Sequence, residues 1–171
     1  MTVGERRSAS RRLRMTVVVL LSGWLGAAIL FAAVLAPAAF RLLPSAALAG
    51  GVIGGVLPPL FLSGFVCGGA LGAVAIGLAR DQRRSPCFAA GVLMAAACAG
   101  DQLVVGRAIE RVRGSIGGPV GELAANDPRR VAFGRLHGLS IAMLALAMAG
   151  AGSGLAMLLP STHSREDPGG A

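Results

Sequence analysis

The stretch from Met15 to Ala36 reads MTVVVLLSGWLGAAILFAAVLA and contains no charged side chain over its 22 residues. As an α-helix it would be about 33 Å long, enough to cross a hydrocarbon core of about 30 Å. Five arginines precede it within residues 1–14, opposed only by Glu5. A cleavable signal sequence usually has a shorter apolar region, of roughly 7 to 15 residues. We therefore expect a retained first transmembrane helix, with a signal sequence as the alternative.

The rest of the chain repeats this arrangement of an apolar run between charged segments. In the second run, 38 uncharged residues are interrupted by Pro58 and Pro59. That length is short for two crossings, which need roughly 20 residues each. One long helix, kinked or restarted at the proline pair, is therefore expected. Counting the first run, four transmembrane spans are predicted, at residues 15–36, 57–79, 86–106 and 136–159.

The last two spans carry helix signals that continue past their apolar residues. Residues 126–128, Asn-Asp-Pro, predict the start of the last helix, because Asp caps helices and Pro suits the first helical turn. Charged residues up to Arg113 extend the helical pattern of the third span. We predict an all-α integral membrane protein, a four-transmembrane-helix bundle over residues 15–159 whose third and fourth helices extend beyond the membrane. A basic segment, 1–14, precedes it, and a disordered tail, 160–171, follows it.

The composition favours lipid over nucleic acid as the partner of this chain. Apolar residues make up 54% and charged residues 14%, against roughly 25% charged in an ordinary soluble domain. All 16 basic residues are arginines, and they lie in clusters between uncharged runs, which suits anchoring at a membrane interface better than a DNA-facing stripe. The three cysteines, Cys67, Cys87 and Cys98, show neither disulfide-framework nor zinc-site spacing. We expect a lipid bilayer as partner, no nucleic acid and no cofactor.

The arginine distribution also bears on orientation. With four crossings, the side of the N-terminus carries nine arginines and the opposite side seven. The first helix usually dominates orientation. We therefore predict a multi-pass protein of the plasma membrane with both termini in the cytoplasm; the inverted topology is the alternative.

Small residues recur at four-residue spacing in two of the predicted spans. Such edges allow close approach of another helix backbone. They could pack helices within the chain, join it to a second copy or to another membrane protein, or arise by chance in a Gly- and Ala-rich chain. These residues are Gly64, Gly68 and Gly72 in the second span, and Ala145, Ala149, Gly150, Ser153 and Gly154 in the fourth.

Polar residues of the third and fourth helices form the candidate functional cluster. An ionisable side chain within a membrane span is by default a functional hypothesis, and antiparallel packing would set Asp101 within about one turn of His137 and nearly level with Ser140. The cluster could be a structural clamp, a site that handles a proton or a ligand, or an unpaired snorkelling aspartate. It comprises Asp101, Gln102, Arg107, Arg130, Arg135, His137 and Ser140.

Three segments resemble a known family. Residues 36–40, APAAF, and 57–61, LPPLF, resemble the first half of the transmembrane protein 205-like family, the domain of unknown function 4149. Residues 130–140, RVAFGRLHGLS, are similar to the segment that enters that family's last helix. The resemblance extends over about residues 20–155 and implies a four-helix integral membrane protein without an assigned enzymatic activity. Gly106 departs from the family, which tends to have proline there.

The sequence offers no recurring set of nucleophile, base and orienting group, and no metal-ligand spacing. Haem held between two histidines would need a homodimer, because only His137 lies near a span. We therefore expect a non-enzymatic, transporter-like or accessory membrane protein that acts through the polar cluster. The alternative is a structural or assembly partner of another membrane protein that uses the glycine-rich edges.

Overall fold

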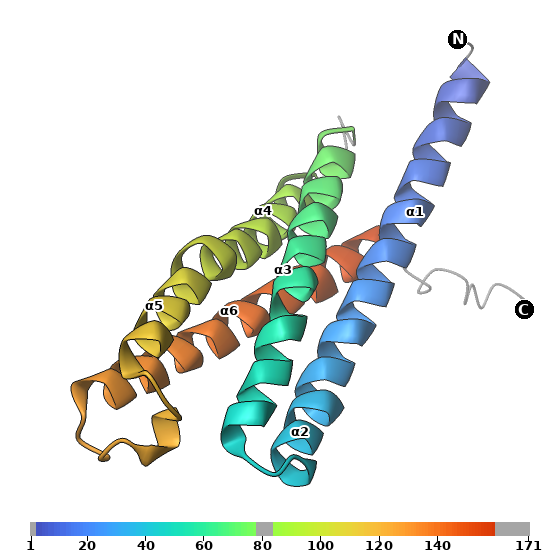
Figure 1. Cartoon of the computed structure of the whole chain (residues 1–171). Helices are drawn as coiled ribbons and strands as arrows, with labels where there is room; N and C mark the ends of the chain where they lie inside the picture. Colours follow the sequence, from blue (N-terminus) through green and yellow to red (C-terminus); the bar gives the residue numbers. More distant parts are fainter. Residues whose placement is uncertain (1–2, 78–83, 160–171) are drawn as a thin grey trace, which may run out of the picture.

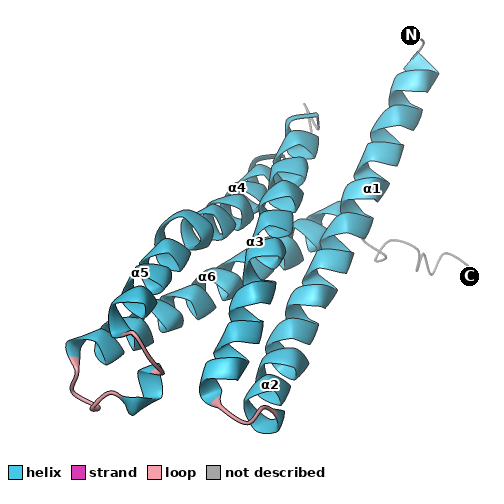
Figure 2. Cartoon of the chain, in the orientation of Figure 1, coloured by secondary structure: helices cyan, strands magenta, loops and turns pink. Residues whose placement is uncertain are grey.

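The computed structural model describes residues 3–77 and 84–159, and this part of the chain folds into helices joined by short loops, without a strand (Figures 1 and 2). Four continuous helical rods are long and apolar enough to cross a membrane. The prediction of an all-α bundle with four transmembrane helices is therefore confirmed. The candidate spans within these rods are Ser8–Leu42, Ala46–Gly77, Pro86–Ile116 and Pro128–Leu158.

The first rod is longer than the predicted span of residues 15–36. It consists of α1 (Val3–Leu30), one turn of π-helix, η1 (Phe31–Leu35), and α2 (Ala36–Leu42). Pro37 cannot donate a backbone hydrogen bond, and the wider π turn that precedes it is closed by the Ala36 N–H, which donates to the Phe31 carbonyl. Helix therefore passes through Pro37 and also includes much of the basic N-terminal segment.

The second rod is a single helix, α3 (Ala46–Gly77), with Pro58 and Pro59 inside it, as expected from the sequence. It begins well before residue 57, because Ser45 caps its start by accepting a hydrogen bond from the Leu48 N–H at 3.2 Å. Residues 78 and 79 of the predicted span lie outside the described residues.

The third rod consists of α4 (Arg84–Gly100), a second π turn, η2 (Asp101–Val105), and α5 (Gly106–Ile116). It continues past the predicted boundary at residue 106 and ends at Gly117, whose φ of 67° is the left-handed conformation typical after a helix C-terminus.

A loop with one short 3₁₀ turn, η3 (Val120–Glu122), leads to the fourth rod, α6 (Pro128–Leu158). The Arg129 N–H donates to the Asp127 carboxylate at 2.8 Å, which is the predicted N-cap. Because α6 begins at Pro128, it extends eight residues before the predicted span of residues 136–159. The predicted tail, 160–171, lies outside the described residues.

Glycines set the distance between the central helices, since α4 packs against both α3 and α6. A Cβ atom added at Gly68 of α3 would lie 2.7 Å from the Ala95 nitrogen of α4. One added at Gly150 of α6 would lie 2.9 Å from the Ala90 oxygen of α4. The backbones therefore approach as closely as glycine allows.

The predicted small-residue edges divide between the interior and the surface. Gly64, Gly68, Gly72, Gly150 and Gly154 are buried within the chain. The other predicted edge residues of α6 are exposed on its outer side: Ala145, Ala149 and Ser153.

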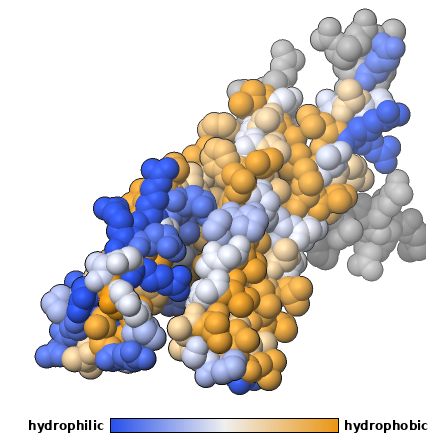
Figure 3. Space-filling view, in the orientation of Figure 1, coloured by the Kyte–Doolittle hydropathy of each residue, from blue (hydrophilic) through white to orange (hydrophobic). Residues whose placement is uncertain are grey.

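The surface of the molecule has both apolar and polar regions. In Figure 3 apolar side chains cover much of the α1–α3 region, whereas charged side chains gather over α5 and the adjoining start of α6. Large apolar residues such as Val19, Leu62 and Ile141 are exposed, as expected of helices surrounded by lipid.

Candidate functional site

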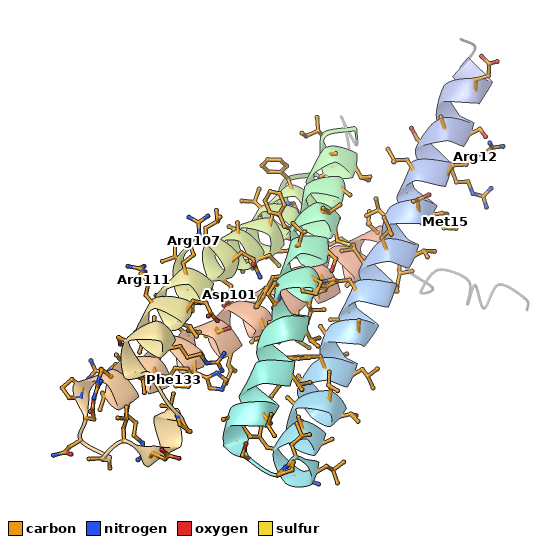
Figure 4. All side chains as sticks on the ribbon, viewed as in Figure 1. Arg12, Met15, Asp101, Arg107, Arg111 and Phe133 are labelled. Atoms are coloured by element: carbon orange, nitrogen blue, oxygen red, sulfur yellow. The ribbon has the colours of Figure 1, made fainter. Side chains whose placement is uncertain are left out.

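Asp101 is a buried carboxyl group in the middle of the third rod. Asp101 is 4% exposed and is the first residue of the π turn between α4 and α5. The π turn contacts both α3 and α6, and Figure 4 shows Asp101 near the junction of these helices. The carboxyl group therefore lies inside the bundle rather than at the lipid-facing surface.

Ser140 of α6 lies beside this carboxyl group. It is 5% exposed, and its side chain is within hydrogen-bonding reach of Asp101. The Oδ1 atom of Asp101 is buried without a hydrogen-bond partner in the described part of the chain. Unsatisfied buried polar atoms are rare in folded proteins, and each calls for a structural or functional explanation.

The backbone at Asp101 has a local geometry of its own. The Gly106 N–H donates to the Asp101 carbonyl, five residues earlier, instead of the usual four. A Cβ atom at Gly106 would lie 3.3 Å from that carbonyl oxygen, so the small residue suits the widened turn. Single π turns inside α-helices are frequent at functional sites. Here the turn changes the rotational position of the residues that follow Asp101.

Gln102, the next residue, bonds to the helix that contains the proline pair. Its Nε2 donates to the Pro58 carbonyl of α3 at 3.4 Å. Nearby, the Trp24 indole N–H donates to the Leu60 carbonyl at 2.8 Å, and the Ser63 hydroxyl donates to the Pro59 carbonyl at 2.8 Å. Three side-chain donors thus converge on consecutive carbonyls of α3.

Sequence reasoning did not single out Trp24 for this role, although two signals were available. It is the only tryptophan in the chain, and it lies within the first apolar run. A buried indole N–H usually has an acceptor. Which carbonyl supplies it depends on how α1 packs against α3, and that arrangement is not encoded locally.

The other predicted members of the polar cluster do not contact Asp101. Arg107 and Arg135 are exposed, and the Arg130 guanidinium donates to the Leu123 carbonyl at 2.6 Å. His137 is exposed and stacks on Phe133, with ring centroids 6.3 Å apart. Of the predicted residues on α6, the structure therefore brings Ser140 to Asp101 and leaves the basic residues elsewhere.

A second polar group, centred on Arg113, joins α5 to its neighbours. The Arg113 guanidinium carbon lies 5.9 Å from the centre of the Phe133 ring, and Nη1 is 3.9 Å from a Glu110 oxygen. Its nitrogens also face α3, where a Cβ atom at Gly50 would lie 3.0 Å from Nη2. The missed signal was Gly50, whose lack of a Cβ atom leaves room for a guanidinium group.

The chemistry available at Asp101 is that of a carboxyl group beside the hydroxyl group of Ser140. In the described residues, no three histidine, cysteine or acidic side chains are grouped so that they could hold a metal ion. Cys67, Cys87 and Cys98 are buried thiols. A carboxyl group can bind and release a proton while the hydroxyl group hydrogen-bonds to it, whereas a calcium ion takes six to eight oxygen ligands.

Comparison with known proteins identifies a family for this chain. No curated protein and no solved structure matches this chain. The sequence model of a domain of unknown function (DUF4149) matches residues 19–116, more than half of the chain. The matched residues include Asp101, Gln102 and both π turns, and they end before α6 and Ser140. This four-helix membrane protein belongs to the DUF4149 family.

Proposed function

We propose that this protein is a non-enzymatic, transporter-like membrane protein that binds and releases a proton at Asp101. The observation that carries the proposal is the buried Oδ1 atom of Asp101, which has no hydrogen-bond partner among the described residues. This atom lies inside a helix bundle with four candidate membrane spans. A charged carboxylate is costly in such surroundings. Binding of a proton removes the charge and gives the group a donor of its own.

Ser140 is the natural partner for both forms of this carboxyl group. A hydroxyl group can donate a hydrogen bond to a carboxylate and can accept one from a carboxylic acid. Ser140 therefore remains a suitable neighbour when the proton binds and when it leaves. Its position on α6 links the protonation of Asp101, on the third rod, to the contact between two transmembrane helices.

Proton transfer in reconstituted vesicles tests this role. The full chain would be placed in vesicles that enclose a pH-sensitive dye, and an imposed pH gradient would be followed over time. Asp101→Asn, which keeps the size of the side chain but cannot ionise, should abolish protein-dependent proton flux. Ser140→Ala should reduce it. Glu110→Gln is the matched control, because it removes a carboxyl group that is 72% exposed on the same rod.

A second readout separates a proton site from a structural residue. Infrared difference spectra between acidic and basic samples should contain a carbonyl-stretch band of a protonated carboxyl group that disappears in Asp101→Asn. Equal proton flux in the wild type and in folded Asp101→Asn, together with an unchanged infrared band, would refute the proposal.

An assembly role is the second candidate, and one observation supports it. Because the glycine edge of α3 is engaged inside the chain, a second copy or another membrane protein would meet the exposed small residues of α6 instead. Crosslinking at Ala145→Cys, in a background without the native cysteines, tests for a second copy. An exclusively monomeric product at high protein-to-lipid ratio would contradict self-association.

For the cellular setting, we propose the plasma membrane with both termini in the cytoplasm. Arg14 on α1 donates to the Leu158 carbonyl at the end of α6, with Nε at 2.9 Å. This contact supports a shared side for the start of the first span and the end of the last. Accessibility of single cysteines at residues 11 and 117 to an impermeant reagent, in intact cells and in opened ones, would distinguish this orientation from its inverse.

A further inference from the structure

Arg107 and Arg111 form an unusual pair on the outer side of α5. They lie one helical turn apart, both are exposed, and both point away from the bundle in Figure 4. The Arg111 Nε donates to the Arg107 carbonyl at 3.2 Å, which holds that side chain along the helix. Neither guanidinium is in an ion pair within the described ranges.

Three neighbouring arginines at this end of the bundle already have partners. Arg129 pairs with Asp127 at 2.9 Å, Arg130 donates to the Leu123 carbonyl, and Arg113 lies over Phe133 near Glu110. Two of the nearby acidic side chains are thus directed to other arginines. The positive charges of Arg107 and Arg111 therefore face outward without an ion pair in the part of the chain that the structure describes.

The residues just before this pair indicate its depth in the membrane. Leu103 and Val104 are 56% and 63% exposed, about one turn before Arg107. Apolar side chains exposed on a transmembrane rod are expected to face acyl chains. Each helical turn rises about 5.4 Å, so Arg107 and Arg111 lie about one and two turns farther along the rod. This spacing suits lipid headgroups next to acyl chains at Leu103 and Val104.

We propose that Arg107 and Arg111 bind the phosphate of an anionic phospholipid, with the acyl chains of that lipid against Leu103 and Val104. Guanidinium groups bind phosphate oxygens through paired, charge-assisted hydrogen bonds. Basic clusters next to a transmembrane helix attract anionic lipids. A choline headgroup brings a positive charge of its own to the same place, so the site favours phosphatidylglycerol over phosphatidylcholine.

Native mass spectrometry of the full chain tests this proposal. Protein exchanged into mixed micelles with equal phosphatidylglycerol and phosphatidylcholine should retain phosphatidylglycerol preferentially. The Arg107→Gln/Arg111→Gln double variant should retain it at least threefold less. The matched control is Arg11→Gln/Arg12→Gln, which removes two exposed arginines from α1 at the other end of the bundle; this variant should retain clearly more phosphatidylglycerol than the Arg107/Arg111 double variant.

Three outcomes would overturn the proposal. One is equal phosphatidylglycerol retention in the wild type and in the Arg107/Arg111 double variant. Another is an equal loss in the Arg11/Arg12 control, because that would indicate a general effect of charge. The third is displacement of the lipid by millimolar inorganic phosphate, which would identify a soluble anion as the ligand. Should the double variant fail to fold, Arg107→Gln and Arg111→Gln alone must each weaken lipid retention.

Discussion

α4 and α1 are held in the bundle in different ways. α4 meets its neighbours backbone to backbone: a Cβ atom at Gly91 would lie 2.8 Å from both the Gly68 oxygen and the Gly72 nitrogen of α3. α1 is joined by side chains that donate to carbonyls of other helices, from Arg14 to Leu158 and from Trp24 to Leu60. Lipid supplies little hydrophobic drive between helices, so close packing and interhelical hydrogen bonds are two ways to associate them. This chain uses close backbone packing at α4 and interhelical hydrogen bonds at α1.

The largest effect is expected where two backbones touch. Gly91→Ala should lower the free energy of unfolding by about 1–3 kcal/mol, the usual cost of overpacking a tight core. The added methyl group meets backbone atoms of α3, which cannot rotate away as a flexible side chain could. Unfolding of the purified protein in mixed micelles, followed by circular dichroism, measures the change.

Gly138→Ala is the control for that substitution. Gly138 is also within a transmembrane rod, in α6, but nothing lies within 4 Å of a Cβ atom added there. Stability should be unchanged or slightly higher, because alanine favours helix more than glycine does. Equal destabilisation by the two substitutions would show that backbone contact does not hold α4.

The next effect concerns the attachment of α1 to the end of α6. Arg14→Gln should cost about 1–2 kcal/mol, because hydrogen bonds from a charged donor contribute about 1.5–3 kcal/mol and this one is only partly buried. The Leu158 carbonyl would also lose a cation near the negative end of the helix dipole. Arg12→Gln removes an exposed arginine two residues before Arg14, about half a helical turn away, and should have little effect in the same unfolding measurement. If Arg12→Gln lowered the free energy of unfolding as much as Arg14→Gln does, the effect would be due to net charge rather than to the contact with Leu158.

A smaller effect is expected from the second donor on α1. Trp24→Phe keeps an aromatic ring but removes the N–H that donates to the Leu60 carbonyl, and it should cost about 1 kcal/mol. The loss should appear in the same unfolding assay. A cysteine introduced on the side of α1 that packs against α3 should also react faster with a thiol reagent in this variant, since α1 separates more readily from α3. Trp24→Phe with wild-type stability would mean that ring packing, rather than the hydrogen bond, joins α1 to α3.

The smallest effect belongs to the start of α6, which lies outside both kinds of contact. The side chain of Arg129 hydrogen-bonds to Asp127 and holds the pKa of that carboxyl group below its usual range, with a further contribution from the Arg129 backbone. Because the pKa is lower in the folded state, this contribution to stability is present at neutral pH and disappears as the pH falls through the folded-state pKa. Asp127→Ala should therefore lower stability slightly at pH 7.

The pH dependence provides the check on that prediction. The difference in stability between the wild type and Asp127→Ala should shrink when unfolding is measured in acid. Asp127→Asn, which retains a capping oxygen but not the charge, should fall between the two at neutral pH. A difference that does not change with pH would contradict a role for the ionised carboxylate.

Much of the secondary structure followed from signals within a few residues. Asp127 before Pro128 predicts a helix start through its capping group and the proline geometry, and that start is present in the structure. Ser45 caps the start of α3 in the same way, although no helix start was predicted there. The similar depth of Ser140 and Asp101 in the bundle followed from the rise per residue of two antiparallel helices. The rotation of each helix did not follow, because the π turn at Asp101–Val105 changes which residues face inward.

Membrane crossing was readable along the chain, because a run of apolar residues determines by itself whether a helix is stable in lipid. Other properties depended on tertiary structure. Packing of α4 between α3 and α6 placed the glycines inside the chain, paired Asp101 with Ser140 and left His137 on the surface. These outcomes depend on interhelical register and rotation, which arise from contacts between residues far apart in sequence, such as Trp24 with Leu60. The hydropathy of a segment depends only on its own residues and therefore cannot predict such contacts.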